Sequence, residues 1–318
     1  MNGQERTKPS KLPDVAVDQE PHHMPLAWVG MNEIEIPVRI TSSEEGSFLV
    51  PARAEVKVRL ETADRGIHMS RLFVGLQSEM ARTEINTSSL QNLTEKLLQS
   101  QKDLSKEVYL SLKFELPVLR PSLLSHNQGW RSYPVVISAY RGPQGYREYL
   151  DVLVTYSSTC PMSAALSRQI NSQAFAENFK ENMVNKDTIE AWLLTPQAMA
   201  ATPHAQRSTA RVRVEKSAES KFTMKDLIEI VESTLQTAVQ SAVKREDEQE
   251  FARRNATNLM FCEDAARKVQ AALKNQTDLR DFYGEFHHLE SLHPHNAVSH
   301  IQKSDGGLNS FAIPTFLR

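Results

Sequence analysis

Strict alternation of apolar and polar residues is the feature that most constrains the fold of this chain. Every second residue from 108 to 116 is apolar, and residues 55–61 alternate apolar with charged side chains. Similar segments occupy residues 34–40, 135–139, 149–156 and 211–215. Successive side chains of a strand point to opposite faces, so such segments form strands with one buried and one hydrated face. The pattern predicts antiparallel sheet.

Helical spacing separates these strands in a repeated order. Apolar residues three or four positions apart predict helices over residues 72–82 and 88–98, the second with Ser88 as its N-cap, and later over 223–242 and 263–274. Thr223 and Asp226 are spaced as a capping box. Residues 117–130 are expected as a loop, and residues 282–292 and 297–301 as the last strands. The order predicts an α+β fold with two similar modules, each an antiparallel sheet carrying a pair of helices.

The predicted borders follow from where the patterns start and stop. They are a flexible arm over 1–25, modules over 26–163 and 204–303, a partly helical insertion over 164–203, and a tail over 304–318.

Composition limits the class of protein. The 318 residues contain 37 Lys plus Arg against 39 Asp plus Glu, so no global field would recruit nucleic acid or an anionic membrane. No apolar run reaches the length of a membrane span, and the two cysteines form no disulfide framework. We expect a soluble cytoplasmic protein whose anionic ligands are bound by local clusters.

Cys160 is the first candidate for chemistry. It follows an alternating strand, and Pro161 forbids a further ladder hydrogen bond, so the thiol should lie at a strand end. A small buried hydrophobe is the alternative for a cysteine without partners.

Histidines supply the second candidate, because five of the ten lie between residues 287 and 300. On a strand, His293 and His295 would face the same side, with Glu290 within one pleat. Imidazole beside carboxylate suits proton transfer near neutral pH or metal binding. A surface strand that is rich in histidine is the alternative.

Four further segments carry polar candidates. His204 could be a ligand or a solvated loop residue, and Glu263 begins a predicted helix, where the dipole stabilises a carboxylate without any ligand. Lys244 and Arg245 are expected to complement the C-terminus of the long predicted helix, whereas Glu248 has no such structural role. A mixed Cys, His and Glu set would suit one divalent metal such as Zn, Mn or Fe.

Eight short motifs then occur in collinear order, at residues 12–16, 28–31, 66–71, 157–161, 204–208, 244–248, 261–264 and 290–295. Together they resemble the prokaryotic type IB GTP cyclohydrolase I family. The resemblance implies a tunnelling fold with two modules per chain and a homotetramer with active sites at subunit interfaces. It also implies conversion of GTP and water to 7,8-dihydroneopterin triphosphate and formate, the entry to folate and, in many bacteria, queuosine synthesis.

The resemblance also assigns roles by position. Cys160, His204 and Glu248 match the metal-site region, and Cys160 with Glu290 and His293 matches the reaction centre. Glu263 matches the carboxylate that binds the guanine N1 and exocyclic amine. The residues assigned to the rest of the substrate, with surface solvation as the alternative for the four cations, are Arg71, Arg207, Lys244, Arg245 and His295.

Met162 stands where the family often has a second cysteine, so a mechanism that needs two thiols is in doubt.

Two other interpretations of the sequence stay open. A tunnelling-fold nitrile reductase would use Cys160 as a covalent nucleophile. A non-catalytic purine-binding assembly module would use Cys160 and the histidines only structurally.

Overall fold

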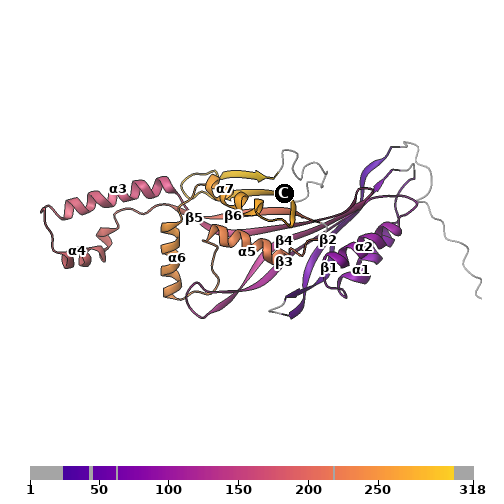
Figure 1. The fold of residues 1–318 in the computed structure, drawn as a ribbon, viewed down its shortest axis with the longest axis horizontal. Coiled ribbons are helices and arrows are strands. Elements are labelled where there is room, and N and C mark those ends of the chain that lie inside the picture. The colour runs from indigo at the N-terminus through magenta and orange to yellow at the C-terminus, as the bar shows by residue number, and fades with distance from the viewer. Residues whose placement is uncertain (1–23, 43–45, 62–63, 218, 304–318) are drawn as a thin grey trace, which may run out of the picture. The chain divides into compact units, whose positions relative to one another are not determined.

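The computed structural model describes residues 24–42, 46–61, 64–217 and 219–303. Nearly all of the predicted arm, and the whole predicted tail over 304–318, lie outside these residues. The described strands form one antiparallel sheet in which β1 to β8 follow sequence order (Figure 1). The predicted α+β class is confirmed.

Helices interrupt the strands at three places in the chain. The elements are β1 Leu26–Ser42, β2 Gly46–Leu60, α1 Met69–Met80, α2 Thr87–Gln99, β3 Val108–Pro121, β4 Gln128–Gly142, β5 Gly145–Thr159, α3 Pro161–Asn178, α4 Lys186–Leu193, a 3₁₀ turn Pro196–Ala198, β6 Ala205–Lys216, α5 Met224–Leu235, α6 Arg245–Thr257, α7 Cys262–Lys274, β7 Leu279–His288 and β8 Ala297–Gln302. The predicted loop over 117–130 is therefore shorter than expected, because β3 continues to Pro121.

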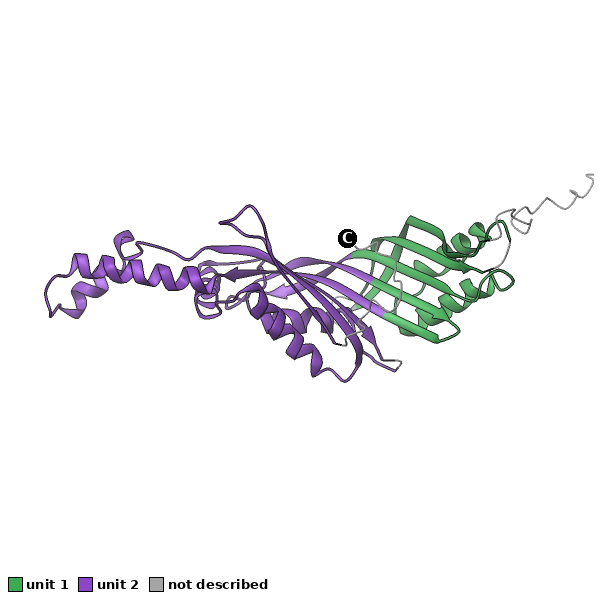
Figure 2. Cartoon of the chain, turned by 90° about the horizontal axis from the view of Figure 1, so that it is seen from above, with its two compact units in different colours: residues 1–114, 137–148 green, residues 115–136, 149–318 purple. Residues whose placement is uncertain are grey.

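Packing divides the chain into two compact units (Figure 2). Unit 1 comprises the described residues up to 114 together with 137–148, and unit 2 comprises 115–136 together with the described residues from 149 onward. Strands β3, β4 and β5 contribute to both units. The predicted module borders, 26–163 and 204–303, stay predictions.

Unit 1 is built on the β1–β2 hairpin, which α1 and α2 cover. The hairpin pairs Leu26 with Leu60 at its open end and Ser42 with Gly46 at its turn. Inward residues of both strands and of both helices are fully buried, among them Val38, Val56, Val58, Leu72, Leu76 and Leu90. The N-cap of α2 is Asn86 and not Ser88, because the Asn86 side chain accepts a hydrogen bond from the Ser89 N–H.

In unit 2, α7 packs against the strands β7 and β8, and α5 packs against α7. The predicted capping box that starts α5 is confirmed, since Thr223 and Asp226 bond reciprocally at 2.8 and 3.2 Å. The buried stripes of the two helices are Leu227, Ile228, Val231 and Leu235 on α5, and Ala265, Val269 and Leu273 on α7. These stripes supply the core under this part of the sheet.

The single helix predicted over 223–242 is wrong. Helix α5 ends at Leu235, and Gln236 adopts a left-handed conformation with φ 65°. The following residues run along β5, where Ser157 and Thr237 exchange hydrogen bonds and Val239 N–H donates to Thr155 O at 3.2 Å. Pairing with the strand therefore overrides the helical spacing of this segment.

Helices α3 and α4 extend away from the sheet of unit 2 (Figures 1 and 2). They confirm helical content in the predicted insertion. The rings of Phe175, Phe179 and Trp192 pack with centroids 5.0 to 5.7 Å apart. Asn171 exchanges two hydrogen bonds with the backbone of Ala201. These local contacts hold the insertion together.

Candidate functional site

Cys160 lies where the sequence predicts, directly after β5. Pro161 occupies the first turn of α3, and Cys160 is the N-cap of that helix. Its Sγ accepts a hydrogen bond from Ser163 N–H at 3.5 Å, and the residue is partly exposed. A helix N-terminus favours negative charge, so this position suits an anionic group bound beside the thiol.

His204 lies beside Cys160, although the whole insertion separates them in sequence. Thr159 pairs with Ala205 at the end of the β5–β6 ladder, and Cys160 N–H donates to His204 O at 3.3 Å. His204 N–H in turn donates to Ser163 Oγ at 3.0 Å. The insertion therefore leaves and rejoins the sheet at adjacent backbone positions.

His204, Gln206 and Glu290 form a polar chain. The Gln206 amide NH₂ donates to Glu290 Oε1 at 3.3 Å, and Gln206 Oε1 lies 3.0 Å from His204 Nδ1. A carboxylate only accepts, so the amide nitrogen of Gln206 must face Glu290 and its oxygen must face His204. Nδ1 then carries the proton, and the lone pair of Nε2 is left for a ligand or a proton.

The strand predicted over 282–292 is too long. Strand β7 ends at His288, which pairs with Ala297 on β8, and residues 289–296 form the loop of that hairpin. Pro294 cannot donate to a ladder, and Ser and Asn favour turns. His293 and His295 therefore lie on a loop and not on a strand. Their exposed rings stack with centroids 5.1 Å apart.

Glu263 begins α7 as predicted, in an exposed position of its first turn. The buried thiol of Cys262 beneath it donates to Phe286 O at 3.4 Å. Burial raises the pKa of Cys262, a hydrogen bond with Ser299 opposes the rise, and the charges of Glu263 and Glu290 add to it. Both carboxylates therefore act electrostatically on the same thiol.

Lys244, Arg245 and Glu248 lie at the start of α6, not at the end of a long helix. Lys244 is the N-cap, and Glu248 is exposed in the first turn. The predicted complement of cations to a helix C-terminus is thus wrong, because the helix that the cations were assigned to ends at Leu235. All three side chains face solvent and are available to a ligand.

The other two predicted arginines, Arg71 and Arg207, belong to different units. Arg207 is exposed on β6, next to Gln206, and its carbonyl accepts from Leu289 N–H at 3.2 Å. Arg71 belongs to unit 1, where its guanidinium donates to Ser100 O at 3.1 Å.

Buried polar pairs that sequence reasoning missed lie beneath the site. Tyr156 OH contacts His288 Nε2 at 3.0 Å, and Ser158 Oγ contacts Ser208 Oγ at 2.8 Å. Burial lowers the pKa of His288 to about 4, against the opposing charges of Glu263 and Asp264. Inward positions on β5, β6 and β7 are the only signal of these pairs, and it does not distinguish polar from apolar packing.

The predicted metal ligands are brought together only in part. Among the described residues, no group of three or more His, Cys, Asp or Glu side chains is arranged to hold an ion. Cys160 and His204 have the right chemistry and adjacent backbones, and Nδ1 of His204 is oriented as a ligating histidine requires. These two residues fit a divalent metal, and the contacts of Glu248 do not place it beside them.

Comparison with known proteins decides the family. The family model described as type I GTP cyclohydrolase folE2 matches residues 12–299. The chain is 50% identical to GTP cyclohydrolase FolE2 of Bdellovibrio bacteriovorus over 295 residues, which covers 92% of this chain and 96% of the relative. It is 40% identical to GTP cyclohydrolase FolE2 of Hydrogenovibrio crunogenus, covering 93% and 96%. This chain belongs to the type I GTP cyclohydrolase FolE2 family.

The FolE2 family member also resembles solved structures of another class. A hyper-thermostable uricase mutant superposes with a TM-score of 0.50 at 9% identity, covering 89% of this chain and 94% of that one. At this identity the likeness concerns the fold alone, and it agrees with the predicted tunnelling fold. Among the described residues, no helix is both long and apolar enough to cross a membrane.

Proposed function

We propose that this chain is a GTP cyclohydrolase I that converts GTP and water to 7,8-dihydroneopterin triphosphate and formate. The observation that carries the proposal is the His204–Gln206–Glu290 chain beside Cys160. In a protein of the FolE2 family, this chain pairs an oriented imidazole with a carboxylate, and its histidine is hydrogen-bonded through the backbone to the residue that carries the thiol. These groups suit hydrolysis at carbon 8 of guanine, a poor electrophile.

Recognition of guanine is assigned to Glu263. A carboxylate accepts two hydrogen bonds from the guanine N1 and exocyclic amine, a donor pair that adenine lacks. Glu263 is exposed in the first turn of α7, so its carboxylate is accessible to a ligand.

Cations are assigned to the triphosphate. Lys244 and Arg245 stand at the N-terminus of α6, where the helix dipole also favours anions. Arg207 lies on β6 beside Gln206. Arg71 and His295 complete the proposed substrate set, with surface solvation as the alternative role of Arg71.

A divalent metal, Zn, Mn or Fe, is proposed at Cys160 and His204, with Glu248 as the third protein ligand. When bound, such an ion would lower the pKa of a water molecule and supply hydroxide near neutral pH. The neighbouring residues orient these ligands, since Gln206 and Glu290 fix the His204 ring and Ser163 N–H holds the Cys160 sulfur.

Proton transfer to the guanine ring nitrogens is assigned to His293. Its ring is exposed and stacks on His295, so it can move without disturbing the core. Glu290, anchored through Gln206, would orient the proton carrier.

A homotetramer with active sites at subunit interfaces, located in the cytoplasm, completes the proposal. An interface would supply the third ligand or the cations that one chain does not gather, and the two free cysteines suit a reducing compartment. Light scattering of the purified chain tests the assembly.

The test of the reaction is a GTP assay that follows formate release and pterin fluorescence. Activity should vanish on chelation and return with Zn, Mn or Fe. Cys160→Ala and His204→Ala should each lower kcat at least about 1,000-fold while circular dichroism stays unchanged. Retained activity in both variants would contradict the site, and no turnover with any of the three ions would contradict the reaction.

A parallel assay addresses the nitrile reductase reading. Consumption of NADPH with 7-cyano-7-deazaguanine, in the absence of any GTP turnover, would favour that enzyme. Binding of GTP without either reaction would favour the non-catalytic module.

A further inference from the structure

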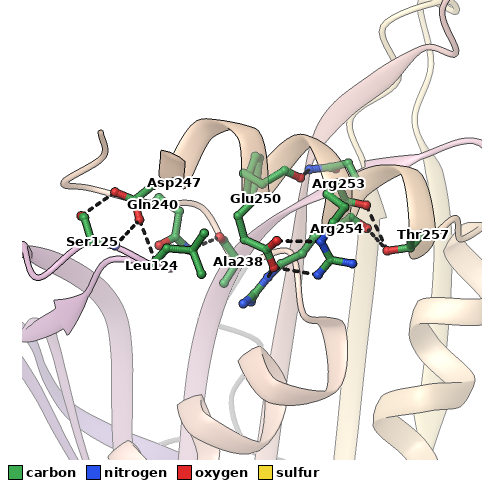
Figure 3. A network of polar contacts seen from close by, with 11 residues as sticks. Leu124, Ser125, Ala238, Gln240, Asp247, Glu250, Arg253, Arg254 and Thr257 are labelled. Atoms are coloured by element: carbon green, nitrogen blue, oxygen red, sulfur yellow. Dashed lines mark hydrogen bonds and ion pairs between the residues drawn. The ribbon is translucent and has the colours of Figure 1, made fainter. Parts of the chain in front are cut away.

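The loop between β3 and β4 is tied to the start of α6 by one buried carboxylate, that of Asp247. Asp247 is fully buried, although its neighbours on the helix are exposed. Oδ1 accepts from the N–H groups of Leu124 and Ser125 at 2.8 and 2.9 Å. Oδ2 accepts from Ser125 Oγ at 2.6 Å (Figure 3) and from Lys244 N–H at 2.8 Å. The four bonds fill the acceptor capacity of the carboxylate, so it has no free lone pair for a substrate.

A second set of contacts joins the same two segments. Ser122 Oγ donates to Ala242 O. Gly129, at the start of β4, lies close to the same segment: an added Cβ would lie 2.4 Å from Ser241 Oγ and 3.0 Å from Ala242 N, so a larger residue would require a shift there. The β3–β4 loop therefore packs directly against the residues that lead into α6.

The C-terminal end of α6 is hydrogen-bonded to β5, the strand that ends directly before Cys160. Asn255 Oδ1 accepts from Ser157 Oγ at 2.7 Å and from Thr159 Oγ1 at 3.4 Å. Asp247 is the one residue of α6 that is buried. The helix has no apolar stripe to hold it, so hydrogen bonds at Asp247 and Asn255 decide where it lies.

We propose that Asp247 is a positioning residue of the site, which fixes the first turn of α6 and through it Lys244, Arg245 and Glu248. The inference rests on the proposed function, which gives those three residues their roles. Asp247 itself touches no substrate, because its side chain is enclosed and its oxygens are occupied.

An ordinary helix cap offers the matched control. Asp226 has the corresponding place in α5 and accepts from Thr223 N–H at 2.8 Å. The hydrogen bonds of Asp226 to Thr223 are local, whereas three of the four bonds of Asp247 reach residues more than 100 positions away. No assigned site residue lies in the first turn of α5.

The experiment compares Asp247→Asn with Asp226→Asn in the full chain loaded with metal. Asparagine keeps the size of the side chain but turns one acceptor into a donor that faces Lys244 N–H or the serine. We expect kcat/KM for GTP to fall about tenfold in Asp247→Asn and less than about twofold in Asp226→Asn, because small displacements of positioning groups slow catalysis strongly. Equal losses in the two variants would overturn the proposal.

Hydrogen exchange of the metal-free protein supplies a readout that is independent of activity. In Asp247→Asn, peptides covering 122–127 and 244–250 should exchange faster, with the rest of unit 2 unchanged. Unchanged exchange in both peptides would overturn the proposal. If the wild-type protein does not turn over GTP while the exchange result holds, the proposed function fails and the link between Asp247 and the site falls with it.

Ser125→Ala provides a second test of the proposal in case Asp247→Asn does not fold. It removes one bond from the distant side and leaves α6 untouched, so we expect about a threefold loss of kcat/KM. In the double variant, the loss should be smaller than the product of the single losses, because both act through the same bond. Multiplicative losses would contradict a shared role.

Discussion

In unit 2, the helix pair α5 and α7 differs from the pair α3 and α4 in how much apolar surface it buries. Along α5 and α7, Leu227, Leu235 and Val269 are completely buried against the sheet. In the insertion, Leu194 is 90% exposed and no residue of α4 is buried. The first pair stabilises the sheet, whereas the second is held together by the ring cluster and by the hydrogen bonds between Asn171 and Ala201.

Because of this difference, the site does not depend on the insertion, although the insertion lies between Cys160 and His204 in the sequence. Cys160 and His204 are held by the ends of β5 and β6 and by the bond between their backbones. The insertion begins and ends at that bond. Changes within α3 and α4 should therefore affect the sheet and the site far less than changes in α5 or α7.

The largest expected effect is in α5. Leu227→Ala removes a fully buried side chain from the helix that covers the sheet, and should lower the free energy of unfolding by about 3 kcal/mol. Urea unfolding followed by circular dichroism measures this change. A loss below about 1 kcal/mol would mean that α5 contributes little more than the insertion does.

His288 gives the next effect, through pH. Its pKa is lowered from 6.5 to about 4 by burial, so the unfolded chain binds more protons between these values. The stabilisation is fully present above pH 6.5 and should be lost, by roughly 2 to 3 kcal/mol, as the pH falls to about 4. Urea unfolding at pH 7 and pH 5 should show a smaller pH dependence in His288→Gln than in the wild-type chain. Equal dependence would contradict a buried neutral imidazole.

Within the insertion, Asn171→Ala should cost about 1 kcal/mol locally, because it removes both hydrogen bonds to Ala201. Proteolysis of the insertion should accelerate while the urea midpoint of the sheet stays nearly constant. A large shift of that midpoint would show that the two regions unfold together.

Leu194→Ser should have the smallest effect, below about 0.5 kcal/mol, because the side chain is already in water. Thermal melting and the GTP assay should both match the wild-type protein. A clear loss of assembly or activity would show that the exposed residues of the insertion meet a partner.

Local patterns predicted the elements whose residues point regularly into the core. The alternation from Val108 to Phe114, the capping box at Thr223 and the position of Cys160 at a strand end agree with the structure. In each case the signal lies within a few neighbouring residues, so one sequence contains it.

Contacts between residues far apart in the sequence explain the predictions that were wrong. Residues 236–242 were predicted as helix, but the bonds of Thr237 and Val239 to β5 decide their path. The distant partners of Asp247 lie in the β3–β4 loop and that of Asn255 lies on β5, and no local pattern marks them. The orientation of His204 likewise depends on Gln206 and on a loop carboxylate, so only tertiary structure could supply it.

The meeting of the insertion's two ends has a consequence for how such a chain can vary. The insertion leaves the sheet and rejoins it at neighbouring peptide groups, so it forms a closed loop. The entropic cost of closing such a loop grows only slowly with its length. Relatives could lengthen, trim or replace the insertion over 164–203 without redesigning the hydrolytic chemistry. For the experimenter, the same junction is a natural place to graft a reporter domain.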